Sequence, residues 1–387
     1  MKKFISILGS TGSIGVTSLN ILNKKKKLFK INILAADKNF NTICKQIKKY
    51  KPIIFAINNK KILFKVKKKF KNSNCKIIHL NEINKYNFLN SDILISAIPG
   101  IAGLTPTINV LKKSKKLLIA NKESVICGWK FIYKIVKKKK IKVIPIDSEH
   151  YGIMSLIRGQ NINSISKIYL TASGGPFLNY KISKIKNVSP QKALKHPRWK
   201  MGKKISIDSA TLMNKILELV EAQKIFNLPE HKLDIIIHPE SLVHAILEFN
   251  NGLIKFIYHD TSMVIPIANA IFDNKLDIKS FYKSKKIKND NIKSFNFMKV
   301  NKNKFPIINI KKIINKYNSS PIIINAVNEI LVDQFLKKKI AFYDIYRVLL
   351  KVLKDRNYKK FAVKDPRNIK EIFQIDDWAR KITLEKI

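Results

Sequence analysis

The chain is poor in arginine, in acidic residues and in cysteine, and each scarcity excludes a class of protein. Only six of its 76 basic residues are arginine, and 26 acidic residues leave a formal charge of +50. A nucleic-acid partner is not expected, because recognition of nucleic acids favours the planar guanidinium of arginine. A lysine-rich solvated surface accounts for the charge instead. A basic nucleic-acid-binding protein is the alternative, and its binding would weaken steeply with added salt.

Paired cysteines and long apolar segments are missing as well. Cys44, Cys75 and Cys127 are odd in number and form no C-x-x-C pair, so neither a disulfide framework nor a zinc site is expected. The apolar start "MKKFISIL" is interrupted at Gly9 without a small-residue cleavage site, and no later segment has the length of a membrane span. We therefore expect a protein of the reducing cytoplasm without a membrane partner.

The chain is long and contains enough apolar residues for several cores. Its 387 residues are 45% hydrophobic, which predicts two or three folded domains. In the first part of the chain, strand-like runs alternate with helical or lysine-rich stretches. This alternation predicts an α/β fold that begins with a Rossmann-like parallel-sheet domain. The expected strands cover residues 4–8, 31–36, 53–57, 75–80, 92–98, 116–120 and 142–146.

A glycine-rich turn, "LGSTGSIG", joins the first expected strand to a helical pattern that starts at Ile14. Gly9, Gly12 and Gly15 permit a tight turn and close approach of the backbone to a phosphate, and the free N–H groups of a helix start attract anions. The turn therefore predicts a dinucleotide site. The spacing is G-x-x-G-x-x-G rather than G-x-G-x-x-G, so a structural turn without a nucleotide is the alternative.

The pattern changes after residue 147. Two strand-like runs within residues 235–259 are joined by "NNG", a hairpin signal that favours an antiparallel sheet and so an α+β domain. Helical periodicity returns in residues 322–336, 341–353 and 369–387. The predicted organisation is a Rossmann-like domain at 1–149, an α+β domain at 150–274, a linker rich in Lys, Asn and Ser at 275–303, and an α-helical domain at 304–387.

Two carboxylates occur together in "VIPIDSEH". In an extended segment Asp147 and Glu149 project from the same side, just past the end of a strand, where open α/β sheets bind their ligands. Hard divalent cations such as Mg²⁺ and Mn²⁺ prefer oxygen ligands of this kind. The alternative is a helix N-cap followed by an acidic first turn.

A second acidic segment is "DSATLMNKILELVEAQ". If Asp208 or Ser209 caps a helix here, Asn214, Glu218 and Glu221 share one face, with Lys215 beside Glu218. The alternative is an ordinary solvated helix face.

Hydroxyl- and glycine-rich segments lie between these two acidic sites. "LTASGGPF" offers Ser173 and "SIDSAT" offers Ser209, each with backbone N–H groups for an oxyanion, although a turn and a helix cap are equally simple interpretations. The intervening "HPRWKMGKK" reads as a mobile lid. His238 and His244 lack a third ligand nearby in the sequence, so no metal is expected there.

Six segments occur in order across nearly the whole chain: "GSTGSIG", "ANKES", "PIDSEH", "SGGPF", "HPRWKMG" and "DSATLMNKILELVEA". In this combination the chain resembles the 1-deoxy-D-xylulose 5-phosphate reductoisomerase family. The resemblance implies a homodimer whose subunit has an NADPH-binding domain, a central catalytic and dimerisation domain, and a helical C-terminal domain. It also implies a phosphorylated sugar as substrate.

The resemblance further implies roles for single residues. Metal ligands for Mg²⁺, Mn²⁺ or Co²⁺ fall on Asp147, Glu149 and Glu218, and Lys122 is a further catalytic residue near the nicotinamide. Substrate contacts fall on Ser148, Glu149, Ser173, His196, Trp199, Ser209, Asn214, Lys215 and Glu218. Cofactor contacts fall on Thr11, Gly12, Ser13, Ile14, Lys38, Asn39, Asn121, Glu123 and Gly202.

The implied reaction rearranges the carbon skeleton of 1-deoxy-D-xylulose 5-phosphate and reduces the resulting aldehyde with NADPH to 2-C-methyl-D-erythritol 4-phosphate, in the non-mevalonate route to isoprenoid precursors. One departure from the family matters for the cofactor. Asp37 lies in the turn after the second expected strand, where the family binds the 2′-phosphate of NADPH and small residues are usual. An acid at this point ordinarily favours NADH.

Overall fold

The computed structural model describes residues 2–199, 201–278, 282 and 295–387. The chain divides into two compact units. The first comprises residues 1–124, 129–151 and 262–285, and the second comprises residues 125–128, 152–261 and 286–387.

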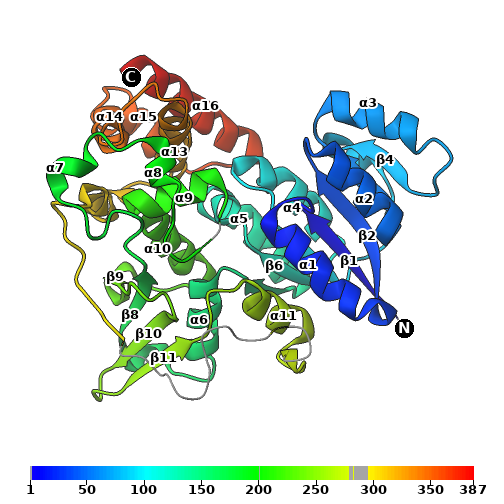
Figure 1. The fold of residues 1–387 in the computed structure, drawn as a ribbon, viewed down its shortest axis with the longest axis horizontal. Helices are drawn as coiled ribbons and strands as arrows, with labels where there is room; N and C mark the ends of the chain where they lie inside the picture. Colours follow the sequence, from blue (N-terminus) through cyan, green and yellow to red (C-terminus); the bar gives the residue numbers. More distant parts are fainter. Residues whose placement is uncertain (1, 200, 279–281, 283–294) are drawn as a thin grey trace. The chain divides into compact units, whose positions relative to one another are not determined.

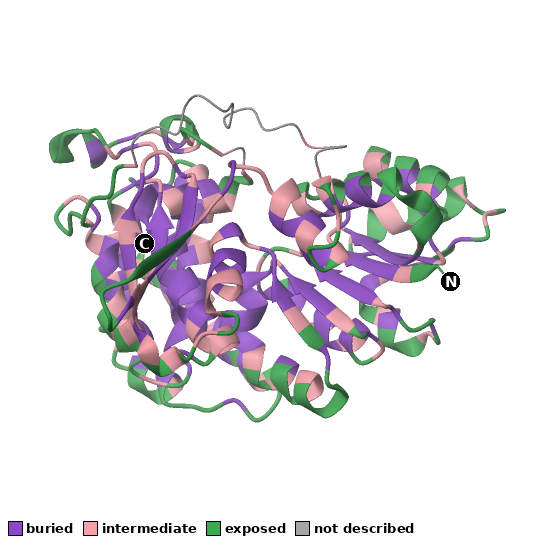
Figure 2. Ribbon diagram, turned by 90° about the horizontal axis from the view of Figure 1, so that it is seen from below, coloured by how far each residue is buried: buried purple, intermediate pink, exposed green. Residues whose placement is uncertain are grey.

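A seven-stranded parallel sheet forms the core of the first unit (Figure 1). Its spatial order is β4-β3-β2-β1-β5-β6-β7. The strands are β1 (Lys3–Leu8), β2 (Phe29–Ala36), β3 (Ile54–Ile57), β4 (Lys76–His79), β5 (Ile93–Ser96), β6 (Lys116–Ile119) and β7 (Lys142–Pro145). Central strands are buried almost throughout, as expected for a sheet with helices on both faces (Figure 2).

The helices of the first unit follow the strands in alternation. They are α1 (Ser13–Lys24), α2 (Phe40–Tyr50), α3 (Lys60–Lys69), α4 (Leu104–Leu111) and α5 (Lys122–Lys139), and α6 (Ser148–Ile157) begins after β7. Short 3₁₀ segments lie at Lys26–Leu28, Leu80–Lys85 and Ile101–Gly103. All seven strands predicted from the sequence are present, which confirms the Rossmann-like α/β prediction for this part of the chain.

The glycine-rich turn has the geometry that its sequence predicts at Gly9. This residue has a φ of +87°, and a Cβ there would lie 2.4 Å from the carbonyl oxygen of Ala97. Any other residue would clash with the backbone and adopt a strained conformation. Gly12 then serves as the N-cap of α1, directly before the helix start.

A later segment returns to the first unit. Helix α11 (Val264–Phe272) packs against α1, and Phe272 meets Phe29 edge to face with ring centroids 5.6 Å apart. Asp273 pairs with Lys116 and Lys142, each at 2.7 Å. Residues 262–274 thus group with the first unit, whereas the sequence placed them with the α+β domain; the predicted domain bounds stay a prediction.

The second unit contains a four-stranded sheet in the order β11-β10-β8-β9. Its strands are β8 (Ile165–Ala172), β9 (Leu233–Ile237), β10 (Val243–Phe249) and β11 (Ile254–Tyr258). The β10–β11 pair is antiparallel and turns at residues 250–253, as the "NNG" signal predicts. Strand β11 forms one edge of the sheet and is mostly exposed.

Helices make up the rest of the second unit. They are α7 (Ile182–Ile185), α8 (Pro190–Ala193), α9 (Lys203–Thr211), α10 (Met213–Phe226), α12 (Lys311–Ile314), α13 (Ser320–Leu336), α14 (Asp344–Leu353), α15 (Tyr358–Ala362) and α16 (Ile369–Lys386). Short 3₁₀ segments lie at Ile162–Ser164, Glu230–Lys232 and Pro306–Ile310. Helices α13, α14 and α16 confirm the helical periodicity predicted near the end of the chain.

Part of the predicted linker at 275–303 lies outside the described residues, which omit 279–281 and 283–294. Within the described part, Met298 forms an antiparallel bridge to Ile237. No helix among the described residues is both long and apolar enough to span a membrane.

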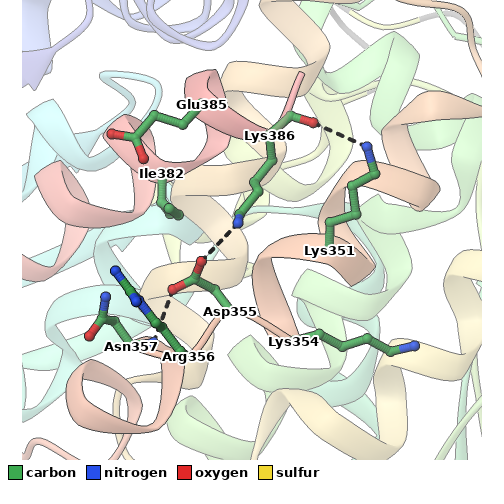
Figure 3. Close-up of a pocket in the computed structure, with 8 residues that line it drawn as sticks. All are labelled: Lys351, Lys354, Asp355, Arg356, Asn357, Ile382, Glu385 and Lys386. Carbon is green, nitrogen blue, oxygen red and sulfur yellow. Dashed lines mark hydrogen bonds and ion pairs between the residues drawn. The ribbon is translucent and has the colours of Figure 1, made fainter.

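A surface hollow of about 420 Å³ lies between the ends of α14 and α16 (Figure 3). Some of its charged groups contact one another. Lys386 pairs with Asp355 at 3.0 Å, and Lys351 donates to the backbone oxygen of Lys386 at 3.4 Å. A hydrogen bond from the backbone of Asn357 is the main cause that holds the pKa of Asp355 below its usual value. These contacts tie helix ends together, and we do not count the hollow as a candidate site.

Candidate active site

The turn after β8 lies against the end of α9 in the second unit. Gly175 has a φ of +66°, and a Cβ there would lie 2.9 Å from the backbone oxygen of Ser209. The backbone N–H of Gly175 donates to the hydroxyl of Ser173 at 3.1 Å. The structure therefore brings together the two hydroxyl-rich segments that the sequence selected as an oxyanion site.

His196 connects the predicted lid to this turn. Its Nδ1 accepts from the backbone N–H groups of Arg198 at 3.2 Å and Trp199 at 2.9 Å. The ring proton of neutral His196 is therefore on Nε2, which donates to the hydroxyl of Ser173 at 2.9 Å. Burial, and then the charge of Lys215, lowers the pKa of His196 to about 4, so this residue is neutral near pH 7.

Helix α10 carries a buried polar cluster. Lys215 Nζ lies 2.8 Å from Glu218 Oε2, and the side-chain amide of Asn214 donates to Glu218 Oε1. Glu218 is only 1% exposed. The polar face predicted from the spacing is real, and the alternative of a solvated face is wrong. A buried carboxylate with a lysine and an amide as partners is a costly arrangement, which is typical of a functional site.

The predicted start of this helix was wrong. Neither Asp208 nor Ser209 is an N-cap, because α9 begins at Lys203 with Gly202 as its N-cap, and both residues lie in its last turns. Leu212 has a φ of +66° and separates α9 from α10. Ser209 reaches the oxyanion turn from the end of one helix, and Asn214 and Lys215 lie at the start of the next.

The predicted lid has contacts of its own in this structure. Trp199 lies edge to face against His244, with ring centroids 6.2 Å apart, and Arg198 donates to the backbone oxygen of Pro239 at 3.1 Å. His244 in turn stacks on His259, with ring centroids 3.7 Å apart. His238 faces Glu240 at 3.0 Å. His238 and His244 thus have protein partners.

The first unit contains the other predicted acidic group, at the start of α6. Asp147 accepts a hydrogen bond from Lys122 at 3.3 Å and another from the backbone N–H of Glu149 at 3.3 Å. The hydroxyl of Ser148 donates to Glu149, and His150 Nδ1 lies 3.7 Å from Asp147. Asp147 thus contacts the first turn of the helix, as the capping alternative requires, and its carboxylate oxygens and that of Glu149 are also suitable ligands for a hard cation.

Comparison with known proteins identifies the family. Three models match, all described as 1-deoxy-D-xylulose 5-phosphate reductoisomerase or its C-terminal domains, over residues 5–128, 143–226 and 260–382. The chain belongs to the 1-deoxy-D-xylulose 5-phosphate reductoisomerase family. The family resemblance predicted from the six segments is confirmed.

Named relatives and solved structures agree. A 1-deoxy-D-xylulose 5-phosphate reductoisomerase of Pelagibacter ubique is 44% identical and covers 98% of both chains, and one of a Sulfurihydrogenibium species is 37% identical over 98% of this chain and 97% of its own. The structure also resembles the Zymomonas mobilis reductoisomerase in complex with NADPH (28% identity, 100% and 99% coverage, TM-score 0.89). A reductoisomerase in complex with NADPH, fosmidomycin and magnesium is similar as well (30% identity, 99% and 98% coverage, TM-score 0.91).

The residues predicted for cofactor binding lie near helix starts, all in the first unit except Gly202, which is the N-cap of α9 in the second unit. Thr11, Gly12, Ser13 and Ile14 surround the start of α1, where no described side chain caps the helix. Asn39 caps α2 by accepting from the backbone N–H of Thr42 at 3.1 Å, next to the exposed Lys38. Asp37 accepts a hydrogen bond from Asn58 at 3.2 Å.

The role of Asn121 as the N-cap of α5 was not predicted from the sequence. Its side-chain oxygen accepts from the backbone N–H of Ser124 at 2.6 Å and so caps α5, while its amide donates to the backbone oxygens of Ile98 and Gly100. Asn121 is 3% exposed, and it fixes Lys122 and Glu123 at the first turn of α5. The N-cap preference of asparagine before a helical pattern was the available signal.

Proposed function

We propose that the chain acts on 1-deoxy-D-xylulose 5-phosphate in the reaction that defines the family. The chain is an NADP-dependent oxidoreductase that rearranges this substrate and reduces it to 2-C-methyl-D-erythritol 4-phosphate. NADPH and a divalent metal ion, Mg²⁺ in a solved relative, are its cofactors. The observation that carries the site assignment is the buried group of Asn214, Lys215 and Glu218, together with the contact between Ser209 and the turn of Ser173.

The metal ligands in this proposal are Asp147, Glu149 and Glu218. All three offer carboxylate oxygens, the donors that Mg²⁺ and Mn²⁺ prefer, and no soft ligand accompanies them. Two of the three carboxylates are already held by lysines, Asp147 by Lys122 and Glu218 by Lys215. These ion pairs fix the carboxylate orientation, which reduces the entropy lost on metal binding.

The phosphate group of the substrate binds in the second unit. Its ligands are Ser173, Ser209, Asn214 and Lys215, which supply hydroxyl, amide and ammonium donors from two helices and one turn. Neutral His196 donates to Ser173 and so leaves the hydroxyl proton of Ser173 available to an incoming phosphate oxygen. The segment from His196 to Gly202, with Trp199, closes over the bound substrate.

The residues divide the chemical tasks between them. When bound, the metal ion holds substrate oxygens and stabilises the negative charge that develops during rearrangement, and NADPH supplies hydride. Lys122 pairs with Asp147 and orients its carboxylate. Ser148, which donates to Glu149, contacts a substrate hydroxyl in this proposal. Binding of the remote phosphate closes the loop and excludes water from the reactive aldehyde.

NADPH binds along the first unit in this proposal. Thr11, Gly12, Ser13 and Ile14 offer the uncapped N–H groups of α1 to its phosphates, as helix starts do elsewhere. Lys38 and Asn39 contact the 2′-phosphate, Asn121 and Glu123 lie on the nicotinamide side, and Gly202 contacts the cofactor from the start of α9. A Cβ at Gly15 would lie 2.4 Å from the backbone oxygen of Gly9, so the turn is compact at the start of α1.

Asp37→Gly should increase the preference for NADPH over NADH. Asp37 follows β2, and its carboxylate is held by Asn58, so it repels a phosphate placed at Lys38 and Asn39. Removing one partly exposed like charge should raise the ratio of kcat/KM for NADPH to that for NADH by roughly two- to fivefold. Lys38→Gln removes a positive charge instead of a negative one, so it should lower the ratio of kcat/KM for NADPH to that for NADH. A native preference for NADH, or a lower ratio in Asp37→Gly, would show that Asp37 has another role.

The fluorescence of Trp199 should change when substrate binds. Its indole now lies against His244, and closure over a phosphorylated ligand transfers it to a different packed environment. The measurement adds a phosphonate–hydroxamate substrate mimic to the enzyme with Mg²⁺ and NADPH, and Trp199→Phe identifies the part of the signal that comes from this indole. An identical response in Trp199→Phe, with binding of the mimic shown by calorimetry, contradicts a moving loop.

A homodimer of the cytoplasm completes the proposal. Strand β11 is a sheet edge with apolar side chains facing solvent, since Ile254 and Phe256 are 62% and 48% exposed, and Leu253 in the turn before it is 59% exposed. Such an edge is normally covered by another chain or element. The three cysteines are free, as a reducing compartment requires. Sedimentation of the full chain measures its mass in solution directly.

The activity is tested by following NADPH oxidation with 1-deoxy-D-xylulose 5-phosphate. We expect turnover with Mg²⁺, loss of turnover when a chelator removes the metal, and recovery when Mg²⁺ is restored. Oxidation of NADPH that does not depend on the metal, or that proceeds with unrelated 2-keto acids, would contradict the proposal and favour another metal-assisted NAD(P)-dependent dehydrogenase.

A further inference from the structure

A buried hydrogen bond connects the phosphate-binding end of α9 to α13. The carboxylate of Asp208 is 1% exposed and accepts from the side-chain amide of Asn328 at 2.7 Å. We infer that Asp208 and Asn328 are positioning residues, which hold Ser209 at the geometry that the substrate phosphate requires. The inference rests on the proposed function, because it takes Ser209 to be a phosphate ligand.

Helix α9 is the element whose position decides the phosphate site. It starts at the C-terminal end of the predicted lid, with Gly202 as its N-cap, and it ends at Leu212, where α10 begins. Ser209 lies in its last turn, with its backbone against Gly175. A shift of this helix by about 1 Å would separate Ser209 from the turn of Ser173 and from Lys215, and misplacement of that size can cost a large factor in rate.

The charge of Asp208 makes the link stronger than an ordinary helix contact. Its other oxygen pairs with Lys204, four residues earlier on α9, at 3.0 Å. Hydrogen bonds to a buried carboxylate are shorter and stronger than neutral ones, and loss of a partner leaves a desolvated charge. Asn328 is itself 1% exposed, and its side-chain oxygen has no hydrogen-bond partner among the described residues. Among the described residues, the hydrogen bond of the Asn328 side chain is thus made to α9.

The support on the other side of this link is rigid. The residue after Asn328 is Glu329, which pairs with Arg380 of α16 at 2.5 Å, and Arg380 also pairs with Asp376. Helices α13 and α16 pack along their lengths. Asp208 therefore connects α9 to a braced pair of helices rather than to a loop, and this is the arrangement that holds a binding residue at fixed geometry.

The test compares Asn328→Ala with a matched control on the same helix. Asn325→Ala removes an equally buried asparagine, one turn earlier, that bonds to Glu329 and not to α9. We expect both variants to lose thermal stability. Only Asn328→Ala should raise KM for 1-deoxy-D-xylulose 5-phosphate about tenfold, with KM for NADPH unchanged, and it should narrow the kcat/KM advantage of this substrate over unphosphorylated 1-deoxy-D-xylulose.

A charge exchange separates positioning from general destabilisation. Asn328→Asp places two buried carboxylates together and should raise KM for the phosphorylated substrate further, while Asp208→Asn with Asn328→Asp restores an amide-to-carboxylate bond across the same gap and should recover most of the loss. Equal effects of Asn325→Ala and Asn328→Ala on this KM, or no recovery in the exchanged pair, would overturn the inference. Ser209→Ala distinguishes the two proposals. If this variant keeps the native kcat/KM ratio of phosphorylated to unphosphorylated substrate, Ser209 is not a phosphate ligand and the proposed site is wrong, whatever the effect of Asn328→Ala.

Discussion

Glu218→Gln should lower kcat/KM at limiting Mg²⁺ by on the order of a hundredfold or more, while KM for NADPH stays near its native value. The amide keeps the size of the side chain but removes the negative charge that a divalent ion needs. It also leaves Lys215 without its buried carboxylate partner at 2.8 Å. The measurement is the initial rate of NADPH oxidation as a function of Mg²⁺ concentration, with NADPH affinity determined separately.

The matched control is Glu221→Gln. Glu221 is a carboxylate three residues further along α10 and is equally buried, at 1% exposed. Its replacement should alter stability but not the Mg²⁺ concentration for half-maximal activation. If Glu218→Gln showed the native Mg²⁺ dependence, or if both variants shifted it equally, Glu218 would not be a metal ligand.

The secondary structure of the first unit was predictable because local signals and tertiary packing agree there. A strand such as β3 is buried at every position and therefore has to be apolar throughout. The helix that follows it in the chain, α3, is rich in lysine, so the boundary between the two elements is visible in the sequence. The turn at Gly9 was predictable for a similar reason, since its φ of +87° and the nearby oxygen of Ala97 leave room for glycine alone. At this position only glycine fits the backbone conformation.

The start of α9 was not predictable from the same kind of signal. Asp208 and Ser209 have the residue types of an N-cap and precede an apolar run, but the structure uses Asp208 as a buried carboxylate within the helix. The break falls instead at Leu212, which adopts a positive φ although leucine has no preference for it. Partners far away in sequence, Asn328 among them, compensate for these local costs, and a single sequence does not reveal such partners.

The grouping of α11 with the first unit had no local signal either. The segment follows β11 directly in the chain, and its apolar pattern fits any core. Its place is decided by Phe272 against Phe29 and by Asp273 between Lys116 and Lys142. Candidate site residues were easier to find than such contacts, because carboxylates, lysines and hydroxyls in short ordered motifs carry chemical information that apolar residues lack.

Lys215→Met should raise KM for 1-deoxy-D-xylulose 5-phosphate by on the order of a hundredfold, because one ammonium group serves two buried anions. It pairs with Glu218 and, in our proposal, with the substrate phosphate. Removing one member of a buried charge pair costs about 2–5 kcal/mol, much of it from the charge left behind. The Kd of a phosphonate substrate mimic, measured by calorimetry, should rise in parallel with KM.

The control for this variant is Lys224→Met, on the same helix. Lys224 is partly buried, burial lowers the pKa of its ammonium group, and its Nζ donates to the backbone oxygen of Ile126 at 2.6 Å. Loss of Lys224 should reduce stability without changing the affinity for the phosphonate. A second readout is the pKa of His196, which the charge of Lys215 helps to lower to about 4 and which should rise in Lys215→Met when followed by NMR. A risen pKa with an unchanged phosphonate Kd would mean that Lys215 acts on the loop alone, and the assignment of the phosphate site would then be wrong.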